Sequence, residues 1–178
     1  MSYRPICDVW LLARPKVPYY GAYPAGFLRR ARELLGVNQV DSVLHVCSGK
    51  VRDYPYSGFG ANDITVDIDP VLEPHYIMDV RQELPKEYSN GHPWDAILVD
   101  PPYTEADAAH YNCGASVLPD PNTLLRDCLA IVKPHGRVGI LHYLLPRPPK
   151  TAKVVALISV IIGYNNRIRC YSVYERLD

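Results

Sequence analysis

Residues 95–103 read Asp-Ala-Ile-Leu-Val-Asp-Pro-Pro-Tyr, an apolar run that ends abruptly at two prolines. Its centre, 97–99, is short and β-branched at both ends, which is typical of a buried strand in a parallel sheet. Pro101 and Pro102 end the hydrogen-bond ladder of that strand because neither has an N–H to donate. The strand therefore delivers a carboxylate (Asp100), free carbonyl oxygens and an aromatic ring (Tyr103) to its carboxyl end.

An exocyclic amine on a planar base needs acceptors for its N–H groups and a ring to stack on, and 100–103 offers both. Asp-Pro-Pro-Tyr resembles motif IV of the amino-methyltransferases, which methylate adenine N6 or cytosine N4 with S-adenosyl-L-methionine. The resemblance implies that Asp100, Pro101, Pro102 and Tyr103 are the catalytic residues: Asp100 and the Pro101 carbonyl accept from the amine, and Tyr103 stacks on the base. A plain turn is the alternative, because Asp before Pro often opens one.

Short apolar strands alternate with connectors along the rest of the chain. The patterns predict strands at 42–46, 63–68, 75–78, 96–99 and 137–143, and two final strands, 153–162 and 167–175, joined by a hairpin signal at 163–166. A helix is expected over 24–35. A second is capped by Asp120, has Pro121 in its first turn and ends at 133–136. Residues 1–24, rich in Pro and Tyr, are expected to be irregular.

This order of elements predicts an α/β fold, a doubly wound Rossmann-like sheet that is mainly parallel and closes in a C-terminal antiparallel hairpin. The pattern is similar to the class I methyltransferase fold from about residue 19 to residue 178. We expect one domain over 1–178, because the length suits one core and leaves no room for a separate target-recognition domain.

The first central strand runs into Cys47, Ser48 and Gly49, where a glycine lets backbone N–H groups approach a ligand. Asp67 and Asp69 follow Gly49 by about 20 residues, the spacing of an acid that holds ribose hydroxyls. The resemblance implies that one of them binds the ribose of the cofactor, with Asp69 favoured by reach. It also implies that Asp79, after the next strand, binds the amine of the cofactor's adenine.

The first motif departs from the glycine-rich pattern of the family. His45 stands where an acid often lies, and Cys47 replaces the first glycine. We interpret His45 as a core histidine and assign it no chemistry. The partner of the methionine carboxylate stays open: Lys50 or Arg52 can pair with it, or both can face water.

Charge, cysteine content and hydropathy limit the other functions that the chain can have. The 19 basic residues balance the 19 acidic ones, so any nucleic-acid binding must use a local patch, such as Arg29-Arg30-Arg32 or Arg147 with Lys150 and Lys153. The five cysteines are scattered and predict reduced thiols, with no metal site. The apolar run 154–162 is about half of the ~20 residues that a membrane span needs. We expect a cytoplasmic protein without membrane contact.

The leading hypothesis is methylation of adenine N6 in DNA. The preference for DNA rests on 23–27, which resembles an element found before the first strand in some DNA enzymes. Two alternatives remain: an rRNA-type base methyltransferase, and a non-catalytic methyltransferase-like binding subunit. Residues 104–119 are expected to form a lid over the target. A homodimer, or a separate partner that supplies specificity, is left open.

Overall fold

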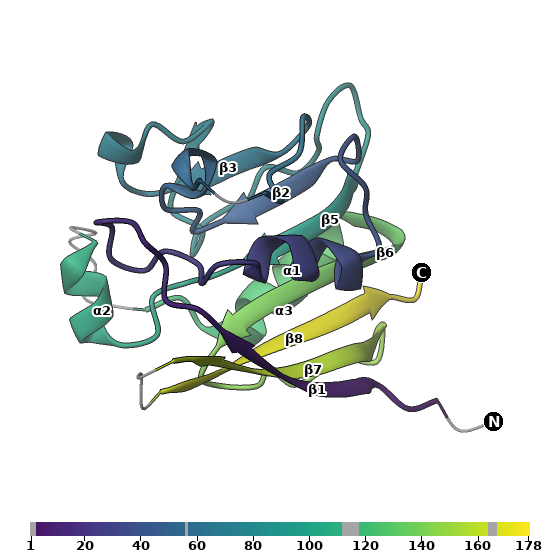
Figure 1. The fold of residues 1–178 in the computed structure, drawn as a ribbon. Coiled ribbons are helices and arrows are strands. Elements are labelled where there is room, and N and C mark those ends of the chain that lie inside the picture. The colour runs from purple at the N-terminus through teal and green to yellow at the C-terminus, as the bar shows by residue number, and fades with distance from the viewer. Residues whose placement is uncertain (1–2, 56, 112–117, 164–166) are drawn as a thin grey trace.

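A computed structural model describes residues 3–55, 57–111, 118–163 and 167–178 (Figure 1). An eight-stranded sheet crosses the molecule in the order β1-β7-β8-β6-β5-β2-β3-β4. The five strands β2 to β6 are parallel to one another, and β8 runs antiparallel to both β6 and β7. The strands are β1 (Ile6–Leu12), β2 (Val43–Val46), β3 (Ile64–Asp67), β4 (Tyr76–Ile77), β5 (Trp94–Val99), β6 (Val132–His142), β7 (Ala152–Ile162) and β8 (Ile168–Arg176).

Helices cover the two faces of the sheet. α1 (Phe27–Leu35) lies on one face and packs on Ala96 and Leu98 of β5, whereas α3 (Pro121–Ile131) lies on the other with Ile97 and Val99 (Figure 1). Alternate residues of a strand point to opposite faces, so a strand covered on both sides must be apolar throughout. The expected α/β fold, with its C-terminal antiparallel strands, is confirmed.

The short elements are α2 (Glu105–His110) and two 3₁₀ turns, η1 (Val51–Asp53) and η2 (Pro70–Leu72). Asp120 caps α3 as expected and accepts from the Thr123 N–H at 2.8 Å. The predicted end of this helix at 133–136 is wrong, because α3 ends at Ile131 and those residues begin β6. No helix in the described ranges is long and apolar enough to cross a membrane.

The prediction that 1–24 is irregular is also wrong. β1 lies in this segment and pairs in parallel with β7, for example Cys7 with Leu157. Its Trp10 is only 6% exposed and packs on Phe27 and Tyr171, with ring centroids 6.1 and 6.0 Å away. Only Trp10 and Leu12 of this edge strand are buried, so the sequence carries little of the apolar pattern by which a strand is recognised.

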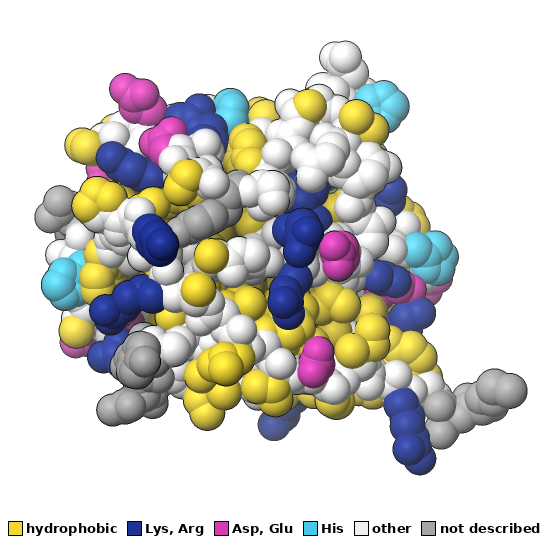
Figure 2. All heavy atoms as spheres, viewed as in Figure 1, with side chains coloured by type: hydrophobic (Ala, Val, Ile, Leu, Met, Phe, Trp, Pro, Cys, Tyr) yellow, Lys and Arg dark blue, Asp and Glu magenta, His cyan; other side chains and the backbone are white. Residues whose placement is uncertain are grey.

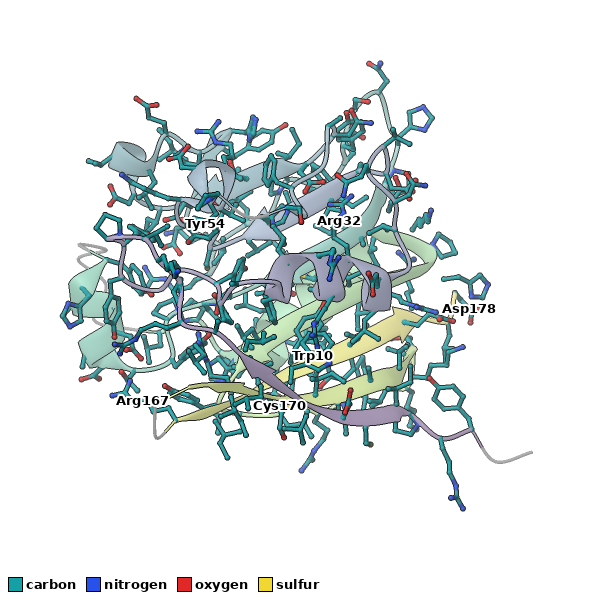
Figure 3. All side chains as sticks on the ribbon, in the orientation of Figure 1. Trp10, Arg32, Tyr54, Arg167, Cys170 and Asp178 are labelled. Atoms are coloured by element: carbon teal, nitrogen blue, oxygen red, sulfur yellow. The ribbon has the colours of Figure 1, made fainter. Side chains whose placement is uncertain are left out.

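A buried ionic cluster links α1 to the sheet. Arg32 is only 3% exposed and lies 2.7 Å from Asp63, whose carboxylate also contacts His45 Nε2 at 2.8 Å (Figure 3). Burial opposes ionisation of Asp63, but His45, the Gly60 N–H and Arg32 together lower its pKa. His45 is thus a core residue, as expected. Arg32 is not part of a surface patch, and Figure 2 shows basic side chains scattered among hydrophobic ones on the face it draws.

Candidate active site

Two pockets meet where β2, β3 and β5 end. The first pocket contains about 770 Å³ of empty space, counted together with the open solvent at its mouth. Residues from the loops after four strands line it: Cys47, Ser48, Gly49, Asp67, Asp79 and Asp100. In the sheet, β2 lies between β3 and β5. The strand order therefore reverses at β2, and the pocket lies at this switch point.

Asp67 is the acid that faces the first pocket after β3. Its side chain accepts the Gly49 N–H at 2.9 Å and the Asp69 N–H at 3.2 Å, and burial raises its pKa. The Ile68 N–H also approaches this carboxylate, which has about four acceptor positions, so about one remains for a ligand. Asp69 does not line the pocket, because its carboxylate accepts the Val71 N–H at 2.9 Å and caps η2. Of the two acids, only Asp67 therefore faces the first pocket.

Asp79 lines the first pocket after β4, but Arg81 holds its carboxylate. Nε and Nη2 of Arg81 lie 2.9 and 2.7 Å from the two carboxylate oxygens, and they lower the pKa of Asp79. Neither Lys50 nor Arg52 lines the pocket: Lys50 lies over the Tyr19 ring, and Arg52 donates to the Glu73 carbonyl. Within the described ranges, no three His, Cys, Asp or Glu side chains are grouped to hold a metal ion.

Cys47 and Gly49 give the loop after β2 its course. Both have a positive φ, 55° and 52°, in the left-handed region that glycine adopts more easily than other residues. This conformation turns the Gly49 N–H toward Asp67. Cys47 thus adopts the left-handed backbone conformation that a glycine would adopt at this position of the turn.

The second pocket, of about 1120 Å³ with the open solvent at its mouth, lies beside the first and is lined by all four residues of 100–103. Arginines from opposite ends of the chain line it: Arg14, Arg167 and Arg169. The two pockets share the wall residues Tyr19, Gly21, Asp100, Pro102 and Tyr111, whereas Pro101 and Tyr103 face the second pocket alone. A group in one pocket can therefore reach a group in the other only past Asp100 and its neighbours.

Asp100 is held in this wall by its backbone and by Tyr103. Its N–H donates to the Val46 carbonyl at 3.1 Å, and the Tyr103 hydroxyl donates to its carboxylate. Burial raises the pKa of Asp100 to about 6, against the opposing effects of Arg169 and Tyr103. The Tyr103 ring packs on Tyr143 and edge-on against His142, with centroids 4.7 and 5.1 Å away. The Tyr103 hydroxyl thus holds Asp100, and the stacking of its ring on a base stays a prediction.

Comparison with solved structures shows what this arrangement of strands is. Crystal structures of TrmN from Thermus thermophilus, N-methyltransferase NodS from Bradyrhizobium japonicum and an rRNA methylase from Streptococcus thermophilus align with TM-scores of 0.62, 0.54 and 0.52. The chain has the class I methyltransferase fold. Identities are 19, 11 and 12%, over 89, 85 and 84% of this chain.

The chain spans half the length of TrmN, but 94 and 95% of the lengths of NodS and the rRNA methylase. No protein-family model and no curated protein sequence matches it. The likeness is one of fold, and the residues of the two pockets must carry any argument about function.

On this methyltransferase fold, α2 closes one side of the second pocket. Thr104 caps α2, and Asp107 accepts from the Tyr20 hydroxyl at 2.6 Å and from Thr104 Oγ1 at 2.8 Å. Arg167, from the start of β8, lies 3.7 Å from the same carboxylate (Figure 3). Asp107 thus ties α2 to the N-terminal segment and to β8. The rest of the expected lid, 112–117, lies outside the described residues.

The sequence analysis missed the pocket residues Gly21 and Arg169, whereas Tyr111 lies within the expected lid 104–119 and Tyr19 was one of the tyrosines considered for base stacking. The tyrosine-rich segment before α1 was the only signal near Gly21, and nothing in the local pattern marks Arg169. The cap of α2 was detectable, since Thr104 precedes Asp107 by three residues.

Proposed function

We propose that this chain is an S-adenosyl-L-methionine-dependent methyltransferase that modifies an exocyclic amine of a nucleic-acid base, with adenine N6 in DNA as its first candidate. The observation that carries the proposal is the place of Asp100, an acceptor in the wall between two pockets. A donor of a methyl group in one pocket and an amine in the other would meet beside it.

The first pocket fits the proposed cofactor. Asp67 faces the pocket and keeps about one acceptor position for a ribose hydroxyl, and the loop that carries Asp79 would lie beside the adenine. Gly49, without a side chain, lets a ligand approach the backbone of the loop after β2. NodS, of the same fold, has been solved with S-adenosyl-L-homocysteine. When bound, S-adenosyl-L-methionine supplies a methyl group on a sulfonium.

The residues of the wall then position the amine. Asp100 and the Pro101 carbonyl accept its two N–H groups, which draws the nitrogen lone pair out of conjugation with the ring. Positive charge develops on this nitrogen during transfer, and the Asp100 carboxylate stabilises it. Asp100 must be ionised for this role, and a pKa of about 6 leaves it mostly ionised at pH 7. The Tyr103 hydroxyl has to share or release the carboxylate when the amine binds.

RNA is the second candidate substrate. The rRNA methylase, one of the solved structures of this fold, aligns with this chain over 95% of its own length. Unpaired RNA bases are also reached without extrusion, whereas a base in duplex DNA must be flipped out of the stack. A non-catalytic binding subunit is the remaining alternative.

Methyl transfer from labelled S-adenosyl-L-methionine to duplex DNA, single-stranded DNA and RNA tests the proposal, with nucleosides resolved by mass spectrometry. We expect methylated adenine in DNA and its loss in Asp100→Ala. Label in RNA alone would select the second candidate. Label in no nucleic acid would contradict the proposal.

Calorimetry with Asp67→Asn and Asp69→Asn tests the cofactor site separately. These two acids lie two residues apart, but only Asp67 faces the first pocket. We expect weaker binding of S-adenosyl-L-methionine for Asp67→Asn and unchanged binding for Asp69→Asn. Absence of binding to the unmodified protein would favour the non-catalytic subunit.

A further inference from the structure

Arg169 is a half-buried cation that faces the second pocket from β8. Within the part of the chain that the structure describes, its side chain has one hydrogen bond, from Nη1 to the Tyr103 hydroxyl at 3.5 Å. Its guanidinium also lies 6.0 Å from the centre of the Tyr103 ring. A guanidinium has five N–H donors, so most of them are available to a ligand in the pocket.

The charge of Arg169 has two opposite effects on the proposed reaction. Arg169 is linked through the Tyr103 hydroxyl to Asp100, beside which the amine would become cationic. Its charge favours the ionised form of Asp100, but it also opposes the developing positive charge on the amine. Neither effect uses the N–H donors that face the pocket, which leaves them for a contact with the substrate.

Tyr103 therefore brings a donor and an acceptor to one spot. The Asp100 carboxylate accepts from an N–H, and the Arg169 guanidinium donates to an oxygen or nitrogen next to it. In adenine the N6 amine is flanked by the ring acceptors N1 and N7, and in cytosine the N4 amine is flanked by N3. Arginine commonly donates to base acceptors of this kind, as it does to N7 and O6 of guanine in duplex DNA.

We propose that Arg169 determines the specificity for the target base by donating to the ring nitrogen beside the methylated amine, while Asp100 accepts from that amine. This inference rests on the proposed function and names the residue that reads the base. A neutral amine without an adjacent acceptor would leave the Arg169 donors unpaired, and the site would reject it.

The test removes either the Arg169 side chain or the ring nitrogen that it is proposed to contact, and compares the two losses of binding. The probe is the oligonucleotide found to be methylated above, resynthesised with 7-deazaadenine or 1-deazaadenine at the methylated position, or with 3-deazacytosine if the product is methylcytosine. Binding in the presence of S-adenosyl-L-homocysteine is measured by fluorescence anisotropy for the wild type and for Arg169→Gln. Arg167→Gln is the matched control, since Arg167 lines the same pocket but lies against Asp107.

We expect the wild type and Arg167→Gln to bind one deaza analogue about ten-fold more weakly than the natural base, the effect of one hydrogen bond to a charged group. Arg169→Gln should bind the natural base more weakly, by a similar factor, and should no longer distinguish it from that analogue. Affinity for S-adenosyl-L-homocysteine and the urea midpoint should stay unchanged, which a purely structural role would not allow.

Discrimination retained by Arg169→Gln would overturn the inference while leaving the proposed function intact. An equal loss for all probes with a smaller salt dependence would also overturn it, and would assign Arg169 to a phosphate. If no nucleic acid is methylated at all, the proposed function itself fails, and the inference fails with it.

Discussion

Asp100→Asn should stabilise the protein while it abolishes methyl transfer. Burial raises the pKa of Asp100 from its ordinary 3.8 to about 6, so ionisation costs more in the folded than in the unfolded chain. The wild type therefore loses stability as the pH rises from about 4 to about 6. The shift corresponds to a loss of up to about 3 kcal/mol above pH 6. Asparagine carries no charge and keeps an oxygen for the Tyr103 hydroxyl, so the variant avoids this loss.

Urea unfolding at pH 4, 5, 6, 7 and 8 checks this expectation. The free energies of unfolding of the wild type and Asp100→Asn should agree near pH 4 and separate up to about pH 6, with the variant the more stable. Asp95, at the other end of β5, is the control. Although burial opposes it, Lys133 at 2.5 Å and the Ser42 donors hold its pKa below the ordinary value. Asp95→Asn should thus lose stability at neutral pH and approach the wild type as the pH falls. An Asp100→Asn variant that is less stable than the wild type at pH 7 would refute the assigned burial of this carboxylate.

Three further changes probe the wall and the fold. Tyr103→Phe removes a hydrogen bond that favours the ionised form of Asp100. The rising limb of the pH–rate profile, at about pH 6 in the wild type, should therefore move up by about one pH unit. An unchanged profile would assign Tyr103 to stacking alone. Gly21→Ala places a Cβ 2.0 Å from the Tyr111 hydroxyl, at a backbone φ of 81°. Because Gly21 and Tyr111 lie in the wall shared by the two pockets, titrations of cofactor and of oligonucleotide should both show weaker binding. Unchanged affinities would show that the Tyr111 side chain moves away freely. Trp10→Ala removes a buried ring and should lower the free energy of unfolding by about 3 to 5 kcal/mol in urea, and a loss under 1 kcal/mol would mean that β1 is loosely attached.

The central strands and α3 could be predicted because their signals are local. 97–99 is apolar on both faces, and Asp120 followed by Pro121 marks a helix start without reference to the rest of the chain. β1 was missed because its evidence is distant. It is an edge strand with one buried face, and its partner β7 lies about 150 residues further along the sequence.

The same distinction separates the two halves of the candidate site. Strand ends could be located from sequence, so the acids after β3 and β4 and the Asp100–Tyr103 turn were found. The choice between Asp67 and Asp69 was not predictable, because it depends on which carboxylate caps η2 and which accepts from Gly49. The sequence identified Tyr103 as an aromatic residue of the site. Its hydrogen bond to Asp100 was not predictable, because it depends on how the ring packs against His142 and Tyr143.

The first pocket is lined mainly by residues at or after the ends of consecutive strands, with Tyr19 and Gly21 in the wall that it shares with the second pocket. The second pocket also needs Arg167 and Arg169 from the other end of the chain. Tyr19 and Gly21 follow β1, and Arg169 lies on β8, so β7 between these two strands sets their separation. A change that loosens β1, such as Trp10→Ala, should therefore weaken oligonucleotide binding more than cofactor binding. Asp67 and Gly49 are joined directly, and their hydrogen bond does not depend on β1. Under the proposed function, recognition of the cofactor would depend mainly on local motifs, and recognition of the target on the pairing of strands that are far apart in sequence.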